Sequence, residues 1–267
     1  MRRIHAFTRF GTLLIALCTL LATASHAPAA VQLGIDRLAA DNFAPVRGKR
    51  VGLICNQTSV DGRGRPTRTV LQKALGRAFT SLYAPEHGID GRAAAGVHVS
   101  STRDRLTGLP VYSLYGDTRK PAPWMLANVD VVLFDLQDIG CRSYTYISTM
   151  ALAMEACGEQ GKDFIVLDRP NPINGQRVQG PPLERSWKSF VGQLPVPYVH
   201  GLTTGELARM ANAEGWTGRR CRLTVVPMSG WQRGMTWNDT GLRWIPTSPN
   251  IPKSNAGFYR RKSRQTF

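Results

Sequence analysis

Short apolar runs bounded by turn residues recur along the chain and alternate with segments of helical periodicity. The strongest run, residues 129–135, is almost continuously apolar, which is typical of a strand covered on both faces of a parallel sheet. Runs of this kind predict strands at residues 49–56, 79–84, 109–116, 129–135, 164–168 and 223–228.

Segments of helical pattern lie between these runs, and the last of them begins with a capping signal. Thr203 or Thr204 is the expected N-cap, with Glu206 in the first turn. The alternation of strands and helices predicts an α/β fold, with a Rossmann-like parallel sheet flanked by helices. No GxGxxG follows the first strand and no GxxxxGK[ST] occurs, so a nucleotide site has little support. The predicted helices are at residues 34–40, 67–75, 123–128, 144–158 and 203–214.

Polar side chains of reactive type follow most of the predicted strands. In a parallel sheet these carboxyl ends meet at one edge, where α/β proteins bind their ligands. The residues are Asn56, Gln57 and Thr58, then Glu86 and His87, then Asp135, Gln137 and Asp138, and finally Asp168, Arg169 and Asn171. Their convergence predicts one pocket. Residues 88–108, rich in Gly, Ala and Arg, are interpreted as a flap over it.

Glu86 is the first candidate for acid–base chemistry, because it follows Pro85 directly after the second strand. His87 is expected to tune it, and the alternative is a polar loop in which Gly88 makes the turn. Paired carboxylates with amides and aromatic residues suit glycoside hydrolysis. One carboxyl group protonates the glycosidic oxygen, and the second attacks or stabilises the anomeric carbon or activates water.

Other interpretations of these residues stay open. Asp135 and Asp138 are candidate ligands of a metal-dependent hydrolase, although the spacing fixes no third ligand. His200 either reaches the same edge or is a structural hydrogen-bonding residue. Five tyrosines either stack on sugar faces or pack in the core: Tyr83, Tyr112, Tyr115, Tyr144 and Tyr146.

The N-terminus has the organisation of a secretory signal peptide, residues 1–30. Arg2, Arg3 and Arg9 flank the start of an apolar run of 14 residues, which small residues follow. The run is too short for a transmembrane helix, which needs about 20 residues, and no second long apolar run occurs. We therefore expect an exported protein, periplasmic or secreted, without stable membrane insertion once the signal is removed.

The formal net charge of +16 leaves +8 on residues 31–252 when the basic ends are excluded. This charge favours anionic surroundings such as a cell-wall polymer, a lipid surface or nucleic acid, or it reflects an Arg-rich composition. Export disfavours nucleic acid as a partner. The cysteines show no CxxC or His-linked spacing, so no metal site is expected from them.

Several short motifs occur in a fixed order along the chain. They are Gly52–Thr58, Pro85–Gly88, Gly108–Gly116, Phe134–Gly140, Tyr144–Tyr146, Leu167–Pro172, His200–Gly201 and Ser248–Asn250. In these motifs the chain resembles a bacterial family of exo-acting β-N-acetylmuramidases, over about residues 33–252.

The resemblance implies removal of N-acetylmuramic acid from the non-reducing ends of peptidoglycan fragments, with no cofactor. It also implies a Rossmann-like domain followed by a smaller C-terminal domain, with the site between them. Glu86 inherits the general-acid role, and the second catalytic group is sought among His87, Asp138 and Asp168. The candidates for substrate binding are Asn56, Gln57, Thr58, Arg142, Tyr144, Tyr146, Arg169, Asn171 and His200.

Two departures from the family pattern qualify this expectation. Gln179 stands where relatives often carry Glu, and the pattern stops after Pro252. We expect residues 31–252 to form the Rossmann-like domain, residues 253–267 to form a basic tail, and the C-terminal domain to be missing. The alternative function is therefore an inactive protein that binds wall glycans.

Overall fold

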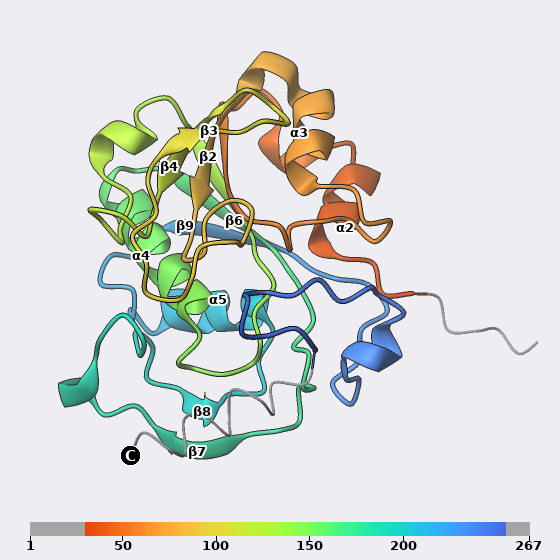
Figure 1. Ribbon diagram of the computed structural model, residues 1–267, viewed down its shortest axis with the longest axis vertical. Coiled ribbons are helices and arrows are strands. Elements are labelled where there is room, and N and C mark those ends of the chain that lie inside the picture. The colour runs from red at the N-terminus through yellow and green to blue at the C-terminus, as the bar shows by residue number, and fades with distance from the viewer. Residues whose placement is uncertain (1–29, 255–267) are drawn as a thin grey trace, which may run out of the picture.

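A seven-stranded sheet lies at the centre of the computed structural model, which describes residues 30–254 (Figure 1). The strand order is β3-β4-β2-β1-β5-β6-β9, and each neighbouring pair is parallel except β3 with β4. The strands of this sheet are β1 (Val51–Cys55), β2 (Phe79–Ala84), β3 (Thr102–Arg103), β4 (Pro110–Ser113), β5 (Val131–Asp135), β6 (Asp163–Leu167) and β9 (Arg222–Val226). The predicted α/β class is confirmed.

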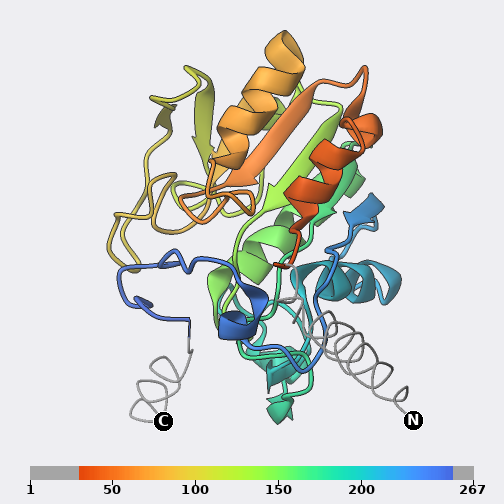
Figure 2. The same cartoon turned by 90° about the vertical axis from the view of Figure 1, so that its right-hand side faces the viewer.

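Helices cover both faces of this sheet (Figure 2). The α-helices are α2 (Gly34–Ala40), α3 (Thr67–Leu75), α4 (Thr145–Glu159) and α5 (Thr204–Ala213). Short 3₁₀ turns are η1 (Ala44–Val46), η2 (Gly76–Ala78), η3 (Pro123–Leu126), η4 (Arg185–Trp187) and η5 (Trp237–Thr240). Thr203 caps α5 by accepting from the Glu206 N–H, while the Glu206 side chain accepts from the Thr203 N–H, as the capping pattern predicts.

Strand β5 shows why its sequence is apolar at successive positions. Val132 and Phe134 pack in the core beside α4 and α5, whereas Val131 and Leu133 pack in the core beside α2 and α3. Successive side chains of a strand point to opposite faces, so a strand with two covered faces needs apolar residues at every position.

The structure differs from the predicted elements mainly at short segments. The third predicted strand ends at Ser113 rather than residue 116, because the Tyr115 carbonyl accepts from Val99 of residues 88–108 instead of continuing the sheet. The helix predicted at residues 123–128 is only a 3₁₀ turn, η3. Strands β3, β7 (Gln179–Pro182) and β8 (Pro197–Val199) were not predicted, since each has two to four residues and no apolar run.

The antiparallel pair β7–β8 and the segment that follows β9 lie beyond the carboxyl ends of β1 and β5 (Figure 2). No helix in the described part of the chain is long and apolar enough to cross a membrane. The predicted signal peptide and almost all of the predicted basic tail lie outside the described residues.

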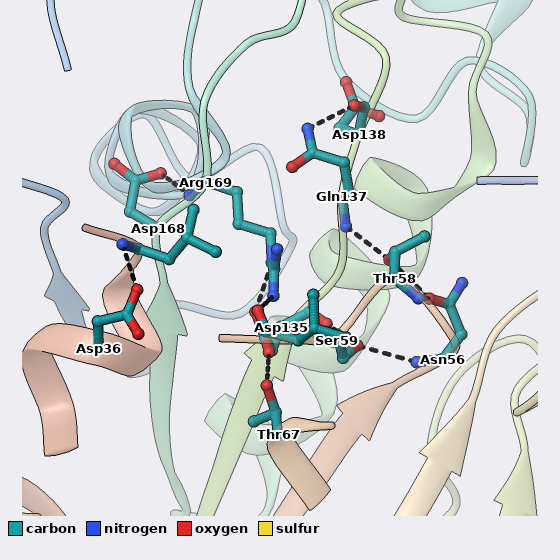
Figure 3. A network of polar contacts seen from close by, with 12 residues as sticks. Asp36, Asn56, Thr58, Ser59, Thr67, Asp135, Gln137, Asp138, Asp168 and Arg169 are labelled. Atoms are coloured by element: carbon teal, nitrogen blue, oxygen red, sulfur yellow. Dashed lines mark hydrogen bonds and ion pairs between the residues drawn. The ribbon is translucent and has the colours of Figure 1, made fainter. Parts of the chain in front are cut away.

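A buried ion pair joins the carboxyl ends of β5 and β6 (Figure 3). Arg169 Nε donates to Asp135 Oδ1 at 2.6 Å, and both side chains are almost completely buried. Thr67 donates to the other carboxylate oxygen at 2.5 Å, and Arg169 Nη2 donates to the Val60 carbonyl at 2.7 Å. The pair therefore connects β5, β6, the start of α3 and the loop after β1.

We predict that Arg169→Met destabilises the fold by about 3–5 kcal/mol, because it leaves the buried Asp135 carboxylate unpaired. Adding Asp135→Leu is expected to recover a large part of this loss. Urea unfolding of the single and double variants measures both effects. The control is Arg50→Met, which breaks the exposed pair with Asp130 and should change the unfolding free energy much less, because water screens exposed charges. Equal losses for Arg169→Met and Arg50→Met would contradict the role given to the buried pair.

Candidate active site

Polar residues at the carboxyl ends of β1, β5 and β6 meet at one edge of the sheet (Figure 3). Thr58 Oγ1 donates to Asn56 Oδ1 at 2.7 Å and accepts from the Gln137 N–H at 3.1 Å. Ser59 Oγ donates to the Asp135 carbonyl. These contacts fix the loop after β1 against the loop after β5.

Glu86 follows β2 and lies at the N-terminus of α4. Its Oε2 accepts from Thr145 Oγ1 at 2.6 Å, and its Oε1 accepts from the Gly96 N–H at 3.0 Å. Only 8% of Glu86 is exposed. One oxygen is therefore held by the first residue of a helix and the other by residues 88–108, the predicted flap.

His87 adopts a left-handed backbone, with φ of 70°. Its Nδ1 lies 2.7 Å from the Ala93 carbonyl, so this nitrogen carries the proton and donates. A non-glycine residue in this conformation is costly and is retained where surrounding contacts enforce it. The ring is thus anchored to residues 88–108, and no hydrogen bond between the side chains of His87 and Glu86 is seen in the described structure.

Tyr115, which follows β4, lies beside Glu86. Burial raises the pKa of Tyr115, and the charge of Glu86 and a hydrogen bond to it raise this pKa further. Tyr115 contacts Phe190 with ring centroids 5.8 Å apart. The vicinity of Glu86 therefore combines a carboxylate, a phenol and aromatic rings.

Asp138 and His200 form a second buried pair at the same edge. Asp138 Oδ2 accepts from the Gly140 N–H at 2.7 Å, and His200 Nε2 lies 3.7 Å from this oxygen. His200 Nδ1 accepts from the Leu202 N–H, so Nε2 carries the proton. Asp138 Oδ1 is buried and makes no hydrogen bond to the described residues.

A pair of tyrosines connects the surroundings of the two carboxylates. Tyr144 and Tyr146 have ring centroids 4.7 Å apart. Burial raises the pKa of both; Asp138 adds to the shift of Tyr144 and Glu86 to that of Tyr146. Thr145, between them in sequence, donates to Glu86. Glu86 and Asp138 therefore flank one aromatic pair at the N-terminus of α4.

Asp168 is bound entirely by protein groups. Its Oδ1 accepts from the Gly205 N–H at 2.7 Å and its Oδ2 from Thr203 Oγ1 at 3.0 Å, both at the start of α5. Burial raises its pKa to about 6, against these bonds, which favour the charged form. This carboxylate joins the end of β6 to α5.

Several other predicted binding residues are engaged in holding the chain together. Asn56 donates to Tyr146, whose hydroxyl donates to the Thr247 carbonyl at 2.6 Å, and Gln57 donates to the Pro246 carbonyl at 2.8 Å. These bonds attach residues 246–247 to the strand ends. Arg142 donates to the carbonyls of Pro181 and Val196, and Asn171 donates to that of Leu202.

A cavity of about 520 Å³ opens between the loop after β1 and the segment that follows β9. Thr58, Gln137 and Arg169 line it from the strand ends, and Trp237 and Arg243 line it from the later segment. Gln137 Oε1 is buried without a hydrogen-bond partner in the described residues. The cavity places three residues of the strand ends on one hollow surface, but neither Glu86 nor Asp138 lines it, so it does not unite all the residues predicted to share one pocket.

The arrangement gives little support to the alternative of a metal site at Asp135 and Asp138. Both oxygens of the Asp135 carboxylate are occupied, one by Arg169 and the other by Thr67. Residues 30–254 contain no group of three His, Cys, Asp or Glu side chains that could hold a metal ion.

Sequence reasoning missed the residues that hold Glu86. Thr145 lies between two tyrosines that were themselves candidate binding residues, and the sequence signal for its role is its position at the start of the helix. Gly96 acts through its backbone, which no side-chain pattern reveals.

Comparison with known proteins identifies the family. Residues 51–255 match the family model described as the N-terminal part of the exo-β-N-acetylmuramidase NamZ. The chain belongs to the NamZ N-terminal family. It is 48% identical to the peptidoglycan β-N-acetylmuramidase NamZ of Bacillus subtilis (strain 168) over 228 residues, which are 85% of this chain and 55% of that protein.

Two crystal structures of DUF1343 family proteins from Bacteroides fragilis NCTC 9343 resemble this chain. One has a TM-score of 0.82 at 50% identity and the other a TM-score of 0.70 at 35% identity. This chain covers 59% of each, and they cover 88% and 86% of it. The chain thus spans little more than half the length of these relatives, and the fold of that part is shared.

The raised pKa of Asp168 predicts a pH-dependent stability. Between its ordinary value of about 3.9 and the folded value of about 6 the folded state binds more protons than the unfolded state, so stability falls as the pH rises through this window. The contribution of Asp168 to the free energy of unfolding is fully present below pH about 4. The part that is lost as the pH rises is on the order of 2–3 kcal/mol.

Asp168→Asn should remove this pH dependence, because the substituted amide does not ionise. Urea unfolding between pH 4 and 7 measures the difference between wild type and variant. Asp41→Asn, at an exposed position, is the control and should parallel wild type. A constant offset between Asp168→Asn and wild type at every pH would contradict the assignment.

Proposed function

We propose that the chain acts as a glycoside hydrolase that releases N-acetylmuramic acid from the non-reducing ends of peptidoglycan fragments, with Glu86 as the general acid. The observation that carries the proposal is the position of Glu86, buried at the N-terminus of α4 within the region that matches the NamZ family. The activity printed for the Bacillus subtilis relative supports the substrate class. The export expected from residues 1–30 agrees with a substrate in the cell wall.

The contacts of Glu86 hold its carboxyl group in a fixed orientation. Such a group has to approach the glycosidic oxygen in a fixed orientation and transfer its proton as the bond breaks. Thr145 and Gly96 fix the orientation through one bond to each oxygen. The low exposure of Glu86 keeps bulk water from the proton.

Asp138 is the best-supported candidate for the second catalytic group. Its Oδ1 is buried and makes no hydrogen bond to the described residues, so no protein donor has to be displaced from this oxygen. The protonated Nε2 of His200 faces its other oxygen. The Asp168 carboxylate, by contrast, is already used by Gly205, Thr203 and Arg169.

We predict that Glu86→Gln lowers kcat/KM about 10²- to 10⁴-fold on a β-N-acetylmuraminide with a chromogenic aglycone that needs protonation, because the amide cannot donate the proton. Aglycone release measured by absorbance tests this. Glu184→Gln, at an exposed carboxylate, is the matched control and should retain activity. Full activity in Glu86→Gln would refute the assignment. Binding of wall fragments without turnover by wild type would favour the alternative, an inactive glycan-binding protein.

Measurements of kinetics and of stability together separate the roles of Asp138 and Asp168. Asp138→Asn should lower kcat at least about 10²-fold, because an amide cannot act as a base or nucleophile, and should change Tm little, because no protein hydrogen bond to Oδ1 is lost. Asp168→Asn should act mainly on stability. The opposite pattern, in which Asp138→Asn keeps its kcat, would remove Asp138 from the mechanism.

A further inference from the structure

The loop that follows β4 carries a guanidinium close to the proposed general acid. The Arg119 guanidinium carbon lies 3.7 Å from the centroid of the Tyr115 ring and 5.4 Å from that of the Phe190 ring. The Tyr115 hydroxyl in turn lies beside the Glu86 carboxylate. Arg119 is therefore separated from Glu86 by one aromatic side chain.

The charge of Arg119 has no carboxylate partner among the described residues. Its Nη1 donates to the Gly116 carbonyl at 3.0 Å. The charged residues next to it in the sequence are used elsewhere: Asp117 pairs with His98 at 3.1 Å, and Lys120 pairs with Glu159 at 2.8 Å. A guanidinium has five N–H donors, so Arg119 keeps donors for a ligand.

The surroundings hold this guanidinium in place before any ligand arrives. Aromatic rings restrict its plane, and the Tyr115 carbonyl accepts from the Val99 N–H at 2.9 Å. The Lys120–Glu159 pair ties the same loop to α4. An arginine stacked in this way loses less conformational freedom on binding, which favours recognition of a planar anion.

We propose that Arg119 recognises a carboxylate on the 3-O-substituent of the muramic acid residue whose bond Glu86 cleaves. The inference rests on the proposed function and adds a residue that selects the sugar. N-acetylglucosamine, the other sugar of wall glycans, has no such carboxylate, so this contact would distinguish the two sugars. Guanidinium and carboxylate match in planar, bidentate geometry.

Binding rather than turnover tests the inference, so that it does not depend on catalysis. Isothermal titration of the full chain carrying Glu86→Gln compares N-acetylmuramic acid, its neutral lactyl methylamide, and its L-alanine conjugate, whose carboxylate lies one residue further out. We expect the free acid, or the conjugate, to bind about 10- to 100-fold more tightly than the methylamide. Adding Arg119→Ala should abolish this preference and leave the methylamide affinity unchanged.

Control variants separate recognition from folding. Arg119→Lys should keep part of the preference, because the charge remains and the bidentate geometry is lost. Arg77→Ala, an exposed arginine before the amino end of β2, should keep all of it, and thermal melts check that each variant folds. Preference for the free acid assigns the lactyl carboxylate, and preference for the conjugate assigns the peptide carboxylate.

Two results overturn the inference in distinguishable ways. If Arg119→Ala weakens acid and methylamide equally, Arg119 is structural and the proposed function stands. If none of the three ligands binds while the arginine is present, the proposed function fails together with the inference.

Discussion

The bonds around the buried Asp135–Arg169 pair determine how the strand ends are arranged. Removing two charges from water is costly, and further bonds offset part of this cost: Thr67 donates to the second carboxylate oxygen and Arg169 Nη2 donates to the Val60 carbonyl. Those partners come from the segments after β1. The requirement to satisfy a buried charge therefore fixes the loops that bear Asn56, Thr58 and Gln137.

The site contains four carboxylates at the strand ends that look alike in sequence and differ in what holds them. Asp135 and Asp168 have both oxygens bonded within the protein and link elements of the fold. Glu86 also has a donor on each oxygen, one from α4 and one from residues 88–108. Of the four, Asp138 is the one with an oxygen that no donor of the described residues reaches.

The sequence predicted the features of the fold that leave a pattern along the chain. Continuous apolar runs such as residues 129–135 identify buried parallel strands, because two covered faces leave no room for alternation. The polar strand ends identify the edge where a site forms. The sequence could not predict the contacts of Thr145, Gly96 and Tyr115 with Glu86, because these contacts depend on how distant segments of the chain meet. The short strands β7 and β8 were not predicted because β7 is exposed throughout and β8 buries only Val199, so neither has an apolar pattern.

Helix α4 contacts the candidate active site at its N-terminal end and the loop after β4 near its C-terminal end. Thr145 at the first position binds Glu86, while Glu155 and Glu159 in the last turns bind Lys120, the neighbour of Arg119. A helix turns by about 100° per residue and does not stretch. Inserting or deleting one residue within α4 would rotate these two ends against each other and break one set of contacts. Substitutions on its solvent side are tolerated more readily, so the length of α4 should vary much less among relatives than its exposed composition.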